Sequence, residues 1–99
     1  MKLNNFQLLE TDLPNGVQAV LDFGKYHLSI VKSEFSYGGK QGLYEIGVFT
    51  ACDGVANDMT ELPGVTNEGD TVKGHLTEAE VDAIISKMYF LTGTTPRQI

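Results

Sequence analysis

A glycine-rich run, Ser36–Gly42, lies between two strand-like stretches, and it restricts the fold more than any other feature of the sequence. Glycine adopts positive φ at no steric cost, so such a cluster between apolar alternating stretches is typical of a hairpin tip. Residues 26–37 are rich in β-branched and aromatic residues. In residues 43–50 the apolar side chains Tyr44, Ile46 and Val48 share one face of the expected strand, and Leu43 and Phe49 share the other. The apolar parity switches near Ile30–Val31, which indicates a bulge, a bend or burial on both faces. We therefore expect two antiparallel core strands joined by this tip.

The first quarter of the chain predicts two further strands, at residues 6–12 and 17–23. Between them lies Asn15–Gly16, a dipeptide that favours a type I′ hairpin turn because both residues tolerate positive φ. Residues 17–23 alternate with a period of two and have one clearly apolar face. Gly24–Lys25 predicts a tight turn into the next strand.

The C-terminal part predicts one amphipathic helix over residues 78–91. Thr77 and Glu80 have the spacing of a capping box, Leu76 precedes the cap as in a hydrophobic staple, and Gly93 suits the stop. The helix positions expected to share one apolar stripe are Val81, Ile84, Ile85, Met88 and Leu91. The expected fold is α+β: one domain, residues 1–99, with an antiparallel β-meander of three to five strands packed against one C-terminal α-helix.

Residues 51–73 lose the strand pattern and are predicted to form an irregular acidic loop, because turn signals follow one another closely. The net charge of the chain is −6, and residues 51–99 hold eight acids against three bases, a net charge of −5. A solvated, solubilising face is the ordinary interpretation of such a run; a surface for a basic protein partner, including nucleic-acid mimicry, is the functional one. The candidate partner-binding residues are Asp53, Asp58, Glu61, Glu68 and Asp70.

The glycine-rich tip is a second candidate site, for a small nucleotide-type ligand. Its residues would be Tyr37, Gly38, Gly39, Lys40 and Tyr44, which supply backbone contacts, a cation and aromatic stacking surfaces. The run departs from a phosphate-binding loop, because position 41 is Gln and position 34 is Glu. Turn geometry is the simpler explanation of its glycines.

No catalytic motif, metal-ligand spacing or cofactor signature is apparent, so we expect a protein that is not an enzyme. His27, His75 and Cys52 are scattered along the chain and lack paired metal-ligand spacing. The single cysteine is compatible with a reducing cytoplasm, and no apolar run is long enough to span a membrane. The acidic balance also argues against direct nucleic-acid binding.

Three segments carry a family resemblance: residues 26–31, residues 36–46 with the string SYGGKQGLYEI, and residues 74–81 with GHLTEAEV. They resemble a small protein found widely in tailed-phage and prophage genomes, whose function is unassigned. The resemblance covers about half of the chain and implies phage origin and location in the host bacterial cytoplasm. In this chain the acidic loop is longer, and His75 replaces the usual aromatic. No binding residues can be carried over from that group.

The expected function is therefore that of a small accessory protein that binds a host or phage protein and modulates host defence or metabolism. The alternative is a protein that binds a small nucleotide-type ligand at the glycine-rich tip, or that sequesters such a ligand as a sponge protein. We also expect a homodimer, because a short sheet with one covering helix leaves exposed aromatics on its second face.

Overall fold

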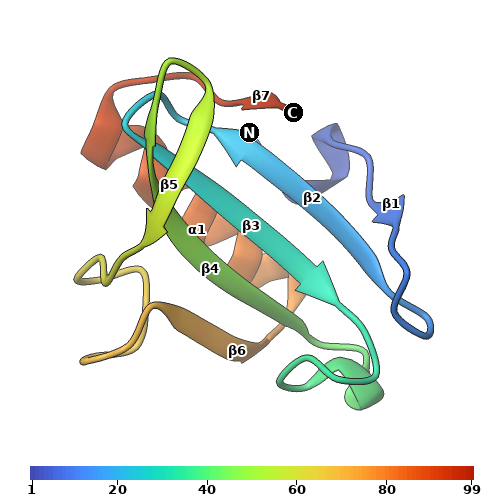
Figure 1. Cartoon of the computed structure of the whole chain (residues 1–99). Coiled ribbons are helices and arrows are strands. Elements are labelled where there is room, and N and C mark those ends of the chain that lie inside the picture. Colours follow the sequence, from blue (N-terminus) through green and yellow to red (C-terminus); the bar gives the residue numbers. More distant parts are fainter.

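A seven-stranded antiparallel sheet carries one α-helix against one of its faces in the computed structural model, which describes all of Met1–Ile99 (Figure 1). The strands are β1 (Leu9–Glu10), β2 (Val17–Asp22), β3 (Tyr26–Lys32), β4 (Tyr44–Cys52), β5 (Val55–Met59), β6 (Val72–Leu76) and β7 (Arg97–Gln98). The helices are α1 (Glu78–Thr92) and the 3₁₀ helices η1 (Leu3–Asn5) and η2 (Gly39–Gln41). The predicted α+β class and meander are confirmed.

Three long strands form the centre of the sheet, and two short strands complete each of its edges. The order β1-β2-β3-β4-β5 follows the chain, while β7 pairs with the outer edge of β2 and β6 pairs with β4. In the centre, Leu28 of β3 lies opposite Leu21 of β2 and Val48 of β4. One face of the three strands therefore presents a continuous apolar row to the helix.

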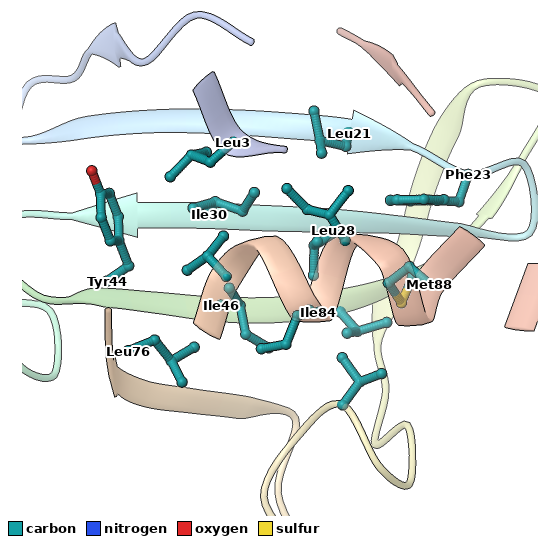
Figure 2. Close-up of a cluster of buried hydrophobic side chains, with 14 residues drawn as sticks. Leu3, Leu21, Phe23, Leu28, Ile30, Tyr44, Ile46, Leu76, Ile84 and Met88 are labelled. Atoms are coloured by element: carbon teal, nitrogen blue, oxygen red, sulfur yellow. The ribbon is translucent and has the colours of Figure 1, made fainter. Parts of the chain in front are cut away.

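The hydrophobic core lies between this face and α1 (Figure 2). Its fourteen buried side chains are Leu3, Leu21, Phe23, Leu28, Ile30, Tyr44, Ile46, Val48, Val65, Leu76, Val81, Ile84, Ile85 and Met88. Four of the five helix positions predicted to be apolar and inward-facing are buried. The prediction was wrong for Leu91, which is exposed, because it lies at the margin of the apolar stripe and one residue from the helix end.

The start of α1 has the predicted capping box. The Thr77 side chain accepts a hydrogen bond from Glu80 N at 3.2 Å, and the Glu80 carboxylate accepts one from Thr77 N at 3.0 Å. The bond from the Thr77 backbone, followed by that of its side chain, lowers the pKa of Glu80 below its usual value of 4.5. The stability that the ionised Glu80 side chain adds to the folded state is therefore fully present above pH 4.5, and it is lost as the pH falls through the lowered pKa.

Replacing Thr77 with alanine is expected to lower the free energy of unfolding by about 1 kcal/mol, because Glu80 N then loses its acceptor. For a domain of this size the melting temperature should fall by about 4–8 °C. Thermal unfolding followed by circular dichroism measures the shift. Thr77→Ser, which keeps the hydroxyl, is the control and should melt near the wild type.

The first hairpin differs from the prediction. Only Leu9–Glu10 of the predicted strand 6–12 pairs with β2, and a turn closed by Gly16 N bonding to Leu13 O joins them. Asn15 has φ 53°, but Gly16 does not have positive φ, so the predicted type I′ turn was wrong. The reason is Pro14: proline favours the position before a positive-φ residue in a turn, and this centres the turn on Pro14–Asn15.

The predicted strand 26–37 ends at Lys32. The pairing of β3 with both neighbours runs without a register shift through Ile30 and Val31, so the parity switch marks neither a bulge nor a bend. Phe35 and Tyr37 belong instead to a loop over residues 33–43 that contains η2. The glycine-rich run is thus part of a structured loop rather than a tight hairpin tip.

The predicted irregular loop 51–73 contains regular structure. β4 continues to Cys52, β5 runs antiparallel to it, and β6 begins at Val72. Asp53 and Gly54 both have positive φ, at 53° and 82°, as a two-residue type I′ turn requires. The signal for this hairpin was therefore present in the sequence, but at Asp53–Gly54 rather than at Asn15–Gly16.

Candidate functional site

The β5 strand is an exposed ribbon at the edge of the sheet. All five of its residues are exposed, and its apolar ends, Val55 and Met59, are 63% and 49% exposed. The ribbon is fixed to β4 by the turn at Asp53–Gly54 and by Thr50 Oγ1, which accepts a hydrogen bond from Asp58 N at 3.2 Å. Its position is thus set by the sheet, although none of its side chains enters the core.

The five predicted partner-binding carboxylates lie along this ribbon and the loop that follows it. The set is Asp53 in the β4–β5 turn, Asp58 in β5, Glu61 just after it, and Glu68 and Asp70 in the turn at residues 67–70; all are exposed. We call these five residues the acidic edge.

Hydrogen bonds draw part of the acidic edge together. Glu61 Oε2 accepts from Gly69 N at 2.6 Å, which places Glu61 beside the turn that carries Glu68 and Asp70. Asp70 Oδ1 accepts from Thr71 N at 2.7 Å. Asp53, at the far tip of the hairpin, is not part of this group. The structure therefore gathers Glu61, Glu68 and Asp70, and it leaves Asp58 on β5 and Asp53 at the tip of the hairpin.

No lysine, arginine or histidine forms an ion pair with the acidic edge. The ion pairs of the structure involve Asp22 alone, with His27 and with Arg97. No group of three or more histidine, cysteine or acidic side chains is arranged to hold a metal ion. The acidic edge thus presents its negative charge to solvent without a neutralising contact from the chain itself.

The residues of the glycine-rich tip serve close backbone packing. A Cβ on Gly39 would overlap Ser33 O, and one on Gly38, whose φ is 87°, would lie 2.9 Å from His75 Cα. His75 N in turn donates to Tyr37 O at 3.0 Å. These contacts fix the loop against β6.

The two tyrosines of this candidate ligand site do not lie together as a stacking pair. Tyr44 is a buried core residue whose ring has Lys32 Nζ 4.7 Å from its centroid, whereas Tyr37 is exposed in the loop. An open hollow beside the tip is lined by Asn15, Lys32, Ser33, Glu34, Gly39, Lys40 and Gly42. Lys40 and Gly39 thus share this hollow, and neither tyrosine lines it.

Two features escaped the sequence interpretation. Asp22 is buried, and its carboxylate lies 3.5 Å from both His27 Nε2 and Arg97 Nε, while its Oδ1 accepts from Gly24 N at 2.7 Å. The sequence could have indicated this pair, because a tight turn at Gly24–Lys25 places Asp22 opposite His27 on the neighbouring strand. The second feature is Phe90, which is 82% exposed on the outer side of α1 and falls outside the predicted stripe.

The α1 helix is too short and too polar to cross a bilayer. Comparison with protein-family models, with curated proteins and with solved structures yields no match to this chain.

Proposed function

We propose that this protein is a non-enzymatic accessory protein that binds a basic surface of another protein through β5 and the acidic edge. The resemblance of its sequence to a tailed-phage family makes a host or phage protein in the bacterial cytoplasm the natural class of partner. Binding would modulate host defence or metabolism by occupying that partner.

One observation carries the proposal: a strand at the sheet edge exposes every side chain, and its apolar ends stand among unpaired carboxylates. Protein interfaces combine apolar contacts that are buried on binding with a polar rim. Val55 and Met59 supply the apolar contacts, and Asp53, Asp58 and Glu61 supply the rim. Because none of these carboxylates forms an ion pair within the chain, they attract a basic surface and accelerate its association.

The β-hairpin also suits this role mechanically. Its backbone is held by the type I′ turn and by ladder bonds to β4, so the surface is ordered before a partner arrives. Pre-ordering reduces the conformational entropy that is lost on binding.

Neutralising Asp53, Asp58 and Glu61 together should weaken partner binding about tenfold, because three rim charges are removed. The substitutions are Asp53→Asn, Asp58→Asn and Glu61→Gln, which keep side-chain size and leave an oxygen acceptor for Gly69 N. The control variant carries Glu10→Gln, Asp12→Asn and Glu34→Gln, an equal charge change at exposed positions elsewhere. The measurement is quantitative affinity capture from lysate of the infected host, with each variant as bait.

A protein captured by the wild type and by the control, and depleted with the acidic-edge variant, supports the proposal. Its binding should also weaken as salt rises, because exposed charges are screened. Equal capture by both triple variants, or no specific capture by the wild type, would overturn it.

A further inference from the structure

The outer side of α1 carries a stripe that the core does not use. The exposed positions Ala79, Ala83, Ser86 and Phe90 follow the spacing i, i+4, i+7 and i+11, which places them in one line along the helix. Three of them are small, and Phe90 is the most exposed large apolar residue of the chain. The helix therefore has a second packing surface opposite its core face.

The two ends of this surface differ in chemistry. The C-terminal end is apolar, and a hollow of about 190 Å³ there is lined in part by Met1, Tyr89, Phe90 and Pro96. The first turns instead hold the acids of the helix, which are Glu78, Glu80 and Asp82, while Lys87 is its single base and lies in the second half.

We propose that two copies of this chain associate through the outer faces of α1, packed antiparallel about a two-fold axis. In a two-fold interface each residue contact occurs twice, so the surface must complement itself. A two-fold axis level with Ile84 and Ile85 places position i of one helix opposite position 169 − i of the other. The residues on the outer side of α1 fit this relation in size and in charge.

The size pattern is complementary. Phe90 of one copy lies opposite Ala79 of the second, where the small side chain leaves room for an aromatic ring. Ser86 lies opposite Ala83 at the crossing point, and small residues there let the helix axes approach to about 8 Å. Each Phe90 thereby becomes covered.

The charge pattern selects the antiparallel orientation. Lys87 of one copy falls on the same side as Glu80 of the second copy, two residues from the position directly opposite it, which the long lysine side chain can span. Tyr89 falls on the other side, two residues from the position opposite Asp82 of the second copy. Asp82 Oδ1 already accepts a hydrogen bond from Leu3 N at 2.7 Å, so the second carboxylate oxygen is the acceptor for the Tyr89 hydroxyl. A parallel pair would instead place Glu78, Glu80 and Asp82 next to their own copies, and like charges repel.

The open face of the sheet, where the sequence suggested a dimer, is a poorer candidate for self-association. It carries the hydrogen bond from Gln18 Nε2 to Ser29 Oγ and the Glu45 carboxylate, which already accepts from Tyr37 N. The helix interface is short, and interfaces below about 1,200 Å² are typically weak. We therefore expect a dissociation constant in the micromolar range.

Sedimentation equilibrium over a concentration series tests the proposal. Phe90→Ala should weaken dimerisation at least tenfold, because a buried aromatic anchor is lost. Phe35→Ala is the matched control: Phe35 is 72% exposed in the β3–β4 loop, so this variant should dimerise like the wild type. Both variants should keep the wild-type circular dichroism spectrum, since neither ring is in the core. A monomer at all concentrations up to about 1 mM, or equal dimerisation by both variants, would overturn the proposal.

Cysteine cross-linking tests the orientation in a Cys52→Ser background. A mixture of the Ala83→Cys and Ser86→Cys variants should form a mixed disulfide under mild oxidation, whereas Ala79→Cys alone should not link to itself. Disulfides need Cα atoms within about 7 Å, and the two copies of residue 79 lie at opposite ends of an antiparallel pair. Self-linking of Ala79→Cys would overturn the antiparallel arrangement. The acidic edge plays no part in this interface, so its binding test and this one fail independently.

Discussion

Replacing Gly39 with alanine is expected to lower the free energy of unfolding by about 3 kcal/mol. An alanine Cβ would overlap the carbonyl oxygen of Ser33 and lie 2.6 Å from Ser36 Oγ. That carbonyl cannot move freely, because it accepts hydrogen bonds from Ser36 N at 3.3 Å and from Ser36 Oγ at 3.0 Å. Relief of the overlap therefore requires the loop to break these bonds. Urea unfolding followed by tyrosine fluorescence gives the change.

Gly42→Ala is the matched control, because it tests the effect of positive φ alone, without a steric overlap. Gly42 has φ 77° and nothing within 4 Å of its would-be Cβ, so alanine there meets backbone strain but no steric overlap. The expected loss is about 1 kcal/mol. Equal losses at the two positions would show that turn conformation, and not the contact with Ser33, explains the glycine at position 39.

This contrast shows what the sequence could predict about the glycine-rich run. A cluster of glycines indicates where the chain turns, because their conformational freedom is a local property. It does not indicate what approaches the missing side chains. Gly38 packs against His75 and Gly74 packs against Tyr37, contacts that bridge segments over thirty residues apart. The loop at residues 33–43 therefore looked like a simple hairpin tip.

Elements with strong local signals were predicted well. The helix start followed from the Thr77–Glu80 spacing, and β2 followed from the alternation of residues 17–23. The strands at the sheet edges lack such signals. β1 and β7 have two residues each, and β5 has no apolar alternation, so their pairing depends on the neighbouring long strand. Register with a distant strand is not a local property.

The candidate site shows the same division. Composition identified the acidic residues, but only the fold shows that Glu61 joins the turn of Glu68 and Asp70 while Asp53 stands at a hairpin tip. The outer face of α1 was missed because one apolar stripe already accounted for the helix. The sequence alone does not show whether Phe90 belongs to the core; in the structure the core is formed without it, and its ring is exposed on the outer face of α1.

The segment between β5 and β6, residues 60–71, is tied to the core in spite of its breakers. Val65 is fully buried in the core cluster, and Thr66 beside it is also buried. Leu62 O accepts from Val65 N at 2.9 Å and from Thr66 N at 3.0 Å, while Leu62 N donates to Thr66 Oγ1 at 3.0 Å. This compact turn inserts one valine under the sheet, and it thereby sets where the acidic turn at residues 67–70 stands.

Val65→Ala is therefore expected to lower the free energy of unfolding by about 2 kcal/mol, through two lost methyl groups and the cavity they leave. Val55→Ala makes the same chemical change on exposed β5 and should alter stability by no more than about 0.5 kcal/mol. Urea unfolding compares the two, and hydrogen exchange at the amides of residues 60–71 reports the loop directly. Faster exchange in Val65→Ala, with wild-type exchange in Val55→Ala, would show that a buried valine orders the acidic turn. Equal stability of the two variants would mean instead that the turn is held by its hydrogen bonds, and that the position of Glu68 and Asp70 does not depend on the core.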